Sequence, residues 1–125
     1  GGGGIPVMES GRQYNGIPAV IDKDRLSSLL AVDLQAEALI ISTGVPAVYT
    51  NFGQEDQCEH RHLTVDEAQQ HLDDGQFPAG SMGPKVNSMI DAIRALPTMR
   101  SILCQPGDAL SAMRGDAGTT LSQDD

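Results

Sequence analysis

The stretch GSMGPKVNSMIDAIRAL, residues 80–96, decides how this 125-residue chain is expected to fold. Its apolar residues recur at helical spacing and predict one continuous apolar face that would pack on a sheet. They are Met82, Val86, Met89, Ile90, Ile93 and Leu96. The glycines before this face predict a loop, and Pro97 predicts the end of the helix. Lys85 lies off the apolar face, within the first helical turn.

The junction of this loop and helix, residues 80–85, is a candidate anion site. The first amides of a helix lack backbone partners and carry partial positive charge. Gly83 would let a ligand approach the backbone, and Pro84 suits the first helical position. Lys85 would add a full positive charge that can reach a phosphate oxygen. Taken alone, the same six residues also fit an ordinary loop and helix with a solvated lysine.

The order of apolar runs and helical segments predicts an α/β fold with a mainly parallel sheet. The runs expected as strands span residues 19–21, 38–41, 101–104 and 119–121, and residues 47–50 are expected as a strand or turn. Helices are expected over residues 25–35, between Thr64 and Gly75, and over residues 82–96 and 109–113. Asp22-Lys23-Asp24 joins an extended run to a helix, a common place for functional side chains in such folds.

Several local signals mark where helices and turns begin and end. Thr64-Val65-Asp66-Glu67 forms a capping box, and Gly75 suits the end of the same helix. Asp22 or Asp24 can cap the helix over residues 25–35. The apolar residues at helical spacing there are Leu26, Leu29, Leu30 and Leu34.

Two polar segments are expected outside the regular elements. Residues 9–18 predict a turn or hairpin tip, with Asn15-Gly16 as the strongest turn signal. Residues 51–63 predict an exposed loop. Cys58, His60 and His62 lie close together in that loop, but their spacing does not match a structural zinc site.

The composition of the chain limits the kinds of molecule that it is expected to bind. Hydrophobic residues make up 39% of the chain, with two Phe, two Tyr and no Trp, so the core is expected to be aliphatic. A net charge of −9 argues against nucleic acid and anionic membrane surfaces, although not against a small phosphorylated ligand. Cys58 and Cys104 are expected as reduced thiols in a cytoplasmic protein. No apolar run approaches the roughly 18 residues of a membrane span, and no signal peptide is visible.

Five blocks of the sequence resemble carbamate kinase, in order and in spacing, from residue 1 to about residue 121. They are Gly1-Gly-Gly-Gly-Ile-Pro-Val7, Ala19-Val-Ile-Asp-Lys-Asp24, Val48-Tyr-Thr-Asn-Phe-Gly53, Gly75-Gln-Phe-Pro-Ala-Gly-Ser-Met-Gly-Pro-Lys85 and Ala112-Met-Arg-Gly-Asp-Ala-Gly-Thr119. The resemblance implies an α/β/α sandwich with a mainly parallel sheet, as in the amino-acid-kinase fold. It also implies phosphoryl transfer between ATP and carbamate with Mg²⁺, giving ADP and carbamoyl phosphate. Members of that family are usually cytoplasmic homodimers and often act in arginine fermentation, so the resemblance implies the same for this protein.

The resemblance also implies roles for individual residues. Lys23 and Asp24 match the family's catalytic lysine and organising aspartate, and Lys85 matches the lysine that contacts the nucleotide phosphates. Gly1, Gly2, Gly3 and Gly4 match a glycine-rich loop near the phosphate and carbamate. The remaining nucleotide-binding candidates are Thr43, Gly44, Tyr49, Gly80, Ser81, Met82 and Gly83. No metal ligand is assigned. An aspartate between lysines is expected to hold their ammonium groups in place rather than act as a base.

The chain departs from the family in length and in the nucleotide loop. The family's chain is more than twice as long, so residues 1–121 are expected to form a carboxy-terminal nucleotide-binding half, with residues 122–125 as a disordered tail. Gly44 stands where many members of the family have Asp, with Pro46 and Ala47 following, and Cys104 begins an altered strand end. The isolated chain is therefore expected to have little or no kinase activity.

Two other functions remain open on the sequence. The chain would be a non-catalytic nucleotide-binding or assembly module if it folds only with a partner, and a sheet edge and an apolar helix face would then be exposed. It would otherwise be a different amino-acid kinase, acting on acetylglutamate, glutamate, aspartate or a nucleoside monophosphate. Residues 80–85 disfavour this last reading, because that block resembles carbamate kinase specifically.

Overall fold

A four-stranded sheet forms the centre of the computed structural model, which describes residues 4–124. Its strands, in spatial order, are β3 (Ala38–Ser42), β7 (Arg100–Cys104), β8 (Thr119–Ser122) and β6 (His62–Thr64). The pairs β3–β7 and β6–β8 are parallel, whereas β7–β8 is antiparallel. The α/β fold with a mainly parallel sheet, expected from the order of apolar runs, is confirmed.

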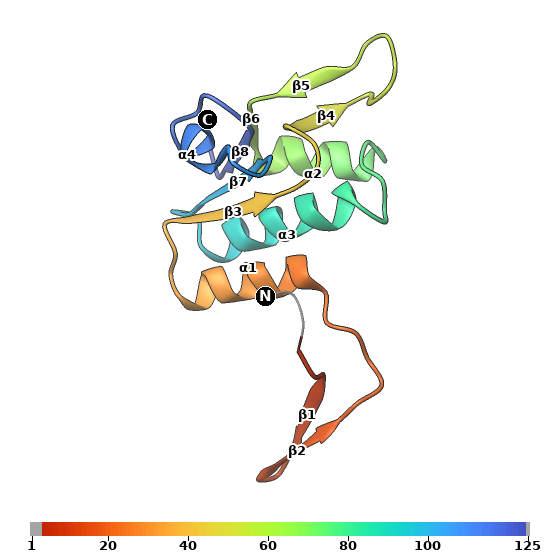
Figure 1. The fold of residues 1–125 in the computed structure, drawn as a ribbon, viewed down its shortest axis with the longest axis vertical. Helices are drawn as coiled ribbons and strands as arrows, with labels where there is room; N and C mark the ends of the chain where they lie inside the picture. Colours follow the sequence, from red (N-terminus) through yellow and green to blue (C-terminus); the bar gives the residue numbers. More distant parts are fainter. Residues whose placement is uncertain (1–3, 125) are drawn as a thin grey trace.

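Helices cover both faces of this sheet, and together they make the α/β/α arrangement (Figure 1). The helices are α1 (Lys23–Asp33), α2 (Val65–Asp73), α3 (Met82–Ala95) and the short α4 (Ala109–Met113). Alternation along β7 separates the two layers: Leu103 belongs to the core cluster under α3, whereas Ile102 and Cys104 pack with Ala112 of α4. Side chains of one strand therefore build both layers, as the two-residue period of a strand requires.

The main core lies under α3, where the predicted apolar face is confirmed. Val86, Met89, Ile90 and Ile93 are fully buried, and Met82 packs partly buried at the edge of the same cluster. Burying each side chain of this size contributes roughly 1.5–3 kcal/mol. This face fixes α3 on the sheet, so the loop that leads into α3 is held at a defined place.

The starts of α2 and α1 are set by side-chain caps. Thr64 Oγ1 accepts the Glu67 amide at 3.2 Å, and the Glu67 carboxylate accepts the Thr64 amide at 2.9 Å, which confirms the capping box. That backbone bond from Thr64 holds the pKa of Glu67 below its usual value. Asp22, not Asp24, caps α1, because its Oδ1 accepts the amides of Asp24 and Arg25 at 2.9 Å each. The bond from Arg25 is the main cause of a lowered Asp22 pKa.

The leucines of α1 are exposed, although their helix forms where it was expected. Leu26 is 38% exposed, Leu29 57%, Leu30 56% and Leu34 70%. The buried side of α1 instead carries Asp24, Ser28 and Ala31, and it packs mainly on α3. Small residues there allow the two helices to approach closely. Strand β3 also lies at an edge of its sheet. An apolar helix face and a sheet edge are therefore both open in the part of the chain that the structure describes.

The amino-terminal region differs from the sequence expectation in two places. An antiparallel hairpin of β1 (Val7–Ser10) and β2 (Gln13–Gly16) projects as an arm away from the helices and the central sheet (Figure 1). Its turn lies at Gly11, which has φ +64°, and not at Asn15-Gly16, which is part of β2. Residues 19–21 form no strand, and Val20 is 95% exposed, because no strand within residues 4–124 pairs with this run.

Three further boundaries are corrected by the structure. Residues 51–63 were expected as a loop, but they contain β5 (Cys58–His60) and the first two residues of β6. Strand β5 pairs antiparallel with β4 (Val48–Thr50) in a separate two-stranded sheet. Pro84 is the third residue of α3 and not the first. Strand β8 includes Ser122, the first residue of the expected tail.

The His60 ring links the β4–β5 sheet to α2 and should make stability depend on pH. Its Nε2 lies 2.9 Å from Thr50 Oγ1, and its ring centroid lies 5.2 Å from that of His71. Burial, followed by the charge of His71, lowers the pKa of His60 below its ordinary 6.5. Folding therefore favours the neutral ring, so this contribution is complete above the unfolded pKa and is lost as pH falls through the folded pKa.

We expect urea unfolding to show a lower free energy of unfolding at pH 5.5 than at pH 7.5, and His60→Gln to flatten that difference. Glutamine removes the titration but keeps a polar group that can bond Thr50. The same slope in the wild-type chain and in His60→Gln would show that another group causes the dependence.

Candidate functional site

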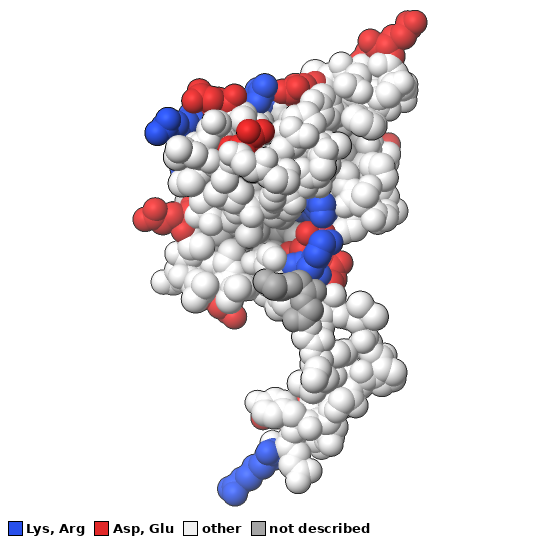
Figure 2. All heavy atoms as spheres, viewed as in Figure 1, with Lys and Arg blue, Asp and Glu red and all other residues white. Residues whose placement is uncertain are grey.

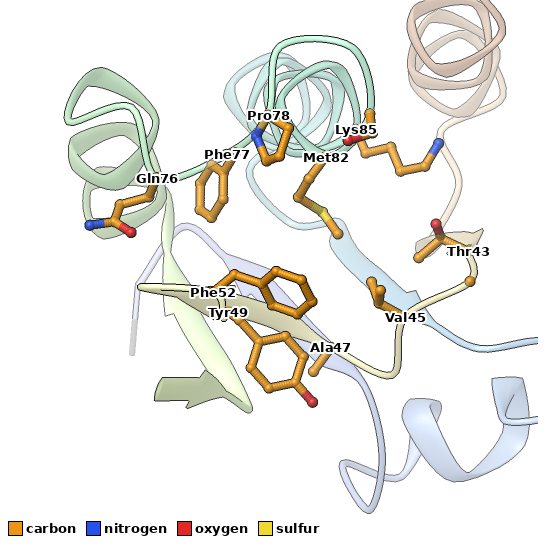
Figure 3. Close-up of a pocket in the computed structure, with 12 residues that line it drawn as sticks. Thr43, Val45, Ala47, Tyr49, Phe52, Gln76, Phe77, Pro78, Met82 and Lys85 are labelled. Atoms are coloured by element: carbon orange, nitrogen blue, oxygen red, sulfur yellow. The ribbon is translucent and has the colours of Figure 1, made fainter. Parts of the chain in front are cut away.

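A cavity of about 320 Å³ opens beside the carboxyl ends of β3 and β7, a usual position for ligands in open α/β sheets (Figure 3). It lies between the loop from β3 to β4, the loop from α2 to α3 and the first turn of α3. The lining residues are Thr43, Gly44, Val45, Ala47, Tyr49, Phe52, Gln76, Phe77, Pro78, Ser81, Met82 and Lys85.

The β3–β4 loop is fixed to the end of β7 by two hydrogen bonds. The Thr43 amide donates to the carbonyl oxygen of Cys104 at 2.9 Å. The side-chain amide of Gln105 donates to the Gly44 carbonyl oxygen at 3.3 Å. This wall of the cavity is therefore held by the central sheet.

One end of the cavity is apolar and aromatic. The rings of Tyr49 and Phe52 lie 5.7 Å apart and are tilted by 56°, and Phe77 and Met82 face them across the cavity (Figure 3). The Tyr49 hydroxyl donates to Glu59 at 2.9 Å. Burial, followed by that bond, raises the pKa of Tyr49, so the ring stays neutral. Such a surface suits a flat apolar or aromatic group.

The other end of the cavity carries Lys85, whose ammonium group is held by Asp24. Lys85 Nζ lies 3.2 and 3.4 Å from the two oxygens of Asp24. Lys23 Nζ lies 3.5 Å from the same carboxylate. The side chains of Lys85 and Asp24 are 13% and 10% exposed, whereas that of Lys23 is 63% exposed. Asp24 therefore lies between two ammonium groups, in the arrangement expected from the sequence.

Asp24 and Lys85 are each positioned by the start of a helix. Asp24 is in the first turn of α1, where the Asp22 cap fixes the chain, and Lys85 is in the first turn of α3. The packing of α1 on α3 brings the two turns together. On the face shown in Figure 2, charges of both signs gather at the recess where the β1–β2 arm meets the body.

The start of α3 is more closed than the sequence suggested. The Pro78 carbonyl oxygen accepts the amides of Ser81 and Gly83 at 3.2 and 2.9 Å. A Cβ at Gly83 would lie 3.1 Å from that same oxygen. A side chain at position 83 would therefore require the loop backbone to shift by a few tenths of an ångström, and the Gly83 amide is already bonded.

The cavity brings together most, but not all, of the residues expected at a nucleotide site. Thr43, Gly44, Tyr49, Ser81, Met82 and Lys85 line it. Gly80 does not line it, and Gly83 lines a neighbouring, more open cavity. Gly4 is exposed, and Gly1–Gly3 lie outside the described residues. The lining residues that sequence reasoning did not assign are Val45, Ala47, Phe52, Gln76, Phe77 and Pro78.

Four of these missed residues carried a usable signal. Phe52 lies in the block of residues 48–53, and Gln76, Phe77 and Pro78 lie in the block of residues 75–85. Both blocks carry the resemblance, but the residues in them that the sequence assigned to the nucleotide are others, namely Tyr49, Gly80, Ser81, Met82, Gly83 and Lys85. Val45 and Ala47 belong to the nucleotide loop, in which the sequence assigned only Thr43 and Gly44 to binding.

The described residues do not fit a metal centre of their own. Within residues 4–124, no group of three or more His, Cys, Asp and Glu side chains could hold a metal ion. Asp24, the carboxylate next to the cavity's lysine, is held by two ammonium groups. No residue in this part of the chain is therefore assigned to Mg²⁺. Among the same residues, no helix is long and apolar enough to cross a membrane.

Comparison with known proteins relates this chain to a kinase family. The model for the family described as the Amino acid kinase family matches residues 2–100. The carbamate kinase of Halobacterium salinarum is 46% identical over 121 residues, which cover 97% of this chain and 39% of that protein. The carbamate kinase of Staphylococcus haemolyticus is 43% identical over 123 residues, covering 98% of this chain and 40% of that protein.

A solved structure agrees with these matches over the same length. Carbamate kinase from Giardia lamblia bound to AMP-PNP superposes with a TM-score of 0.93 at 36% identity, covering 98% of this chain and 43% of that one. This chain thus spans about 39% of the length of the first carbamate kinase that it matches. Its sequence and its fold resemble those of carbamate kinases throughout. The chain belongs to the amino acid kinase family.

Proposed function

We propose that this chain supplies the ATP and ADP site of a carbamate kinase, as the carboxy-terminal nucleotide-binding portion of that enzyme. The observation that carries the proposal is the polarity of the cavity. Aromatic and apolar side chains form one end, and the paired ammonium group of Lys85 lies at the other. A nucleotide has the same division, with a flat base joined to a charged phosphate chain.

The residues of the cavity would act by binding and positioning. Lys85 would place its positive charge beside the phosphates, and Lys23, which is exposed, could turn toward the same charge. Asp24 would keep both ammonium groups in place, since its carboxylate already accepts both. Phosphoryl transfer depends mainly on such positioning and charge stabilisation, so the site needs no covalent intermediate on the protein.

The reaction proposed for the whole enzyme is the transfer of the terminal phosphoryl group of ATP to carbamate, and its reverse. This proposal rests on the likeness to carbamate kinases, one of which is described with bound AMP-PNP. The carbamate pocket is not assigned to residues of this chain. The homodimer, the cytoplasmic location and the role in arginine metabolism stay predictions from the resemblance.

Nucleotide binding tests the proposal directly. We expect ADP, measured by isothermal titration calorimetry, to bind the chain and to slow amide hydrogen exchange across residues 80–85. Lys85→Ala should weaken that binding by roughly 1.5–3 kcal/mol, the usual scale of a hydrogen bond to a charged group. Arg94→Ala is the matched control, because Arg94 is an exposed cation on the same helix.

A second variant keeps the test valid if Lys85→Ala impairs folding. Lys23→Ala removes an exposed side chain and should leave the fold unchanged, yet it should weaken the binding of ADP more than the binding of adenosine. Equal loss for adenosine and ADP would contradict a phosphate role for the lysines. Absence of ADP binding and of exchange protection at millimolar nucleotide would contradict the proposed function itself.

A further inference from the structure

A pair of side-chain amides joins the two walls at the aromatic end of the cavity. The Asn51 backbone amide donates to Gln76 Oε1 at 2.8 Å, and Gln76 Nε2 donates to Asn51 Oδ1 at 3.0 Å. Gln76 thereby uses a donor and an acceptor on one partner that lies 25 residues away in the chain. The bonds connect the loop after β4 with the loop after α2.

Each partner in this amide pair is itself fixed. Gln76 follows Gly75, which has φ +74°, and its backbone amide donates to His71 at the end of α2 at 3.0 Å. Asn51 has φ +51°, in the left-handed region that few residues adopt without support. The Asn51 side-chain amide also donates to Asp56 at 2.7 Å, which fixes the orientation of its oxygen toward Gln76.

The residues next to the pair carry the rings of the cavity. Asn51 precedes Phe52, and Gln76 precedes Phe77, and both rings line the cavity (Figure 3). Phe77 is buried, but Phe52 is 61% exposed, so packing alone does little to fix its ring. The backbone at Asn51, together with the contact to the Tyr49 ring at 5.7 Å, therefore sets where the Phe52 ring lies, and Gln76 holds that backbone.

We propose that Gln76 is a positioning residue that sets the gap between Phe52 and the Phe77 wall, and thereby makes this end of the cavity select a flat base. The inference rests on the proposed nucleotide site and names the residue that controls how the base is recognised. Gln76 would act through Asn51 and Phe52, and its own amide is used in the pair.

Substitutions at Gln76 separate the two hydrogen bonds. Gln76→Leu keeps a similar size and removes both bonds. Gln76→Glu keeps an acceptor for the Asn51 amide, but it brings a carboxylate against Asn51 Oδ1, whose amide cannot turn while Asp56 holds it. Gln70→Leu is the matched control, because Gln70 is exposed on α2 and bonds Asp74 away from the cavity.

The test compares binding of ADP with binding of inorganic pyrophosphate, which has the charges but no base. We expect Gln76→Leu to lower the affinity for ADP about tenfold, because the hydrogen bonds that hold Asn51 in place are lost. Gln76→Glu should lower it less, and Gln70→Leu should not change it. Affinity for pyrophosphate should stay the same in Gln76→Leu and Gln70→Leu, which a general loss of structure would not allow. In Gln76→Glu the added charge weakens both anions, so the ratio of the ADP affinity to the pyrophosphate affinity is compared, and that ratio should fall.

The outcomes distinguish this inference from the proposed function. A wild-type chain that binds neither probe overturns the proposed function and this inference with it. A wild-type chain that binds ADP, with Gln76→Leu and Gln76→Glu equal to it, overturns this inference alone. So does an equal loss of ADP and pyrophosphate in folded variants. If Gln76→Leu fails to fold, the ratio of the two affinities in Gln76→Glu decides.

Discussion

Gly118→Ala should lower the free energy of unfolding by about 4 kcal/mol, an effect at the upper end for single substitutions. Gly118 is buried, has φ +70°, and precedes β8. A Cβ there would lie 2.3 Å from the carbonyl oxygen of Leu103 and 3.1 Å from Cys104 Cβ. Leu103 cannot move away easily, because it is paired with Thr119 in the β7–β8 ladder.

Gly115→Ala is the matched control for this effect. Gly115 lies in the same turn with φ +84°, but a Cβ there would meet nothing within 4 Å. Its substitution should therefore cost only the left-handed backbone strain, about 1–2 kcal/mol. Chemical denaturation of the three proteins at one pH measures both losses. Similar losses in the two variants would show that backbone strain, not the contact with Leu103, is what matters at Gly118.

Thr119, the residue after Gly118, connects this turn to the candidate site. Thr119 Oγ1 accepts the Val48 amide at 2.7 Å and donates to the His60 carbonyl oxygen at 2.5 Å. One hydroxyl thus connects β8 with both strands of the β4–β5 sheet, which carries Tyr49 into the cavity. The bond from Val48 to Thr119 joins residues 71 positions apart, so it has no local signal in the sequence.

The parts of the fold that the sequence predicted are those with a local cause. The capping box needs only Thr64 and Glu67, and the buried face of α3 needs only its helical spacing. Strand β5 was missed because Cys58-Glu59-His60 is short, mostly exposed and without an alternating apolar pattern. The exposure of the α1 leucines could not be predicted from local sequence either, because burial depends on what packs against the helix.

The charged end of the site was predicted, whereas the aromatic end was only partly predicted. Lys85 and Asp24 follow from residue type, from helix starts and from the resemblance, although they are 61 positions apart. Phe52 and Gln76 have ordinary structural uses, so residue type alone did not select them. Their contribution depends on two loops meeting through the Asn51 pair, which is a property of the folded chain.

Asp24→Ala should lower the free energy of unfolding by about 3 kcal/mol, because it would leave the Lys85 ammonium buried without its carboxylate. Lys85→Met should be destabilising for the converse reason, as it leaves a carboxylate that is 10% exposed and that, among the described residues 4–124, keeps only the longer ammonium contact to Lys23. Removal of both charges should recover much of the loss. Urea unfolding of the wild-type chain, the two single variants and the double variant measures the coupling energy of the pair.

Lys23→Met is the control, because Lys23 shares the same carboxylate but its side chain is 63% exposed. Its loss should cost less than about 1 kcal/mol, as for other solvent-exposed ion pairs. If the losses in Asp24→Ala and Lys85→Met simply add in the double variant, the two charges do not depend on one another. A large coupling energy between Asp24 and Lys85, with a small loss in Lys23→Met, would instead mean that Asp24 mainly fixes the buried ammonium group. A fixed ammonium group is what the proposed nucleotide site requires of Lys85.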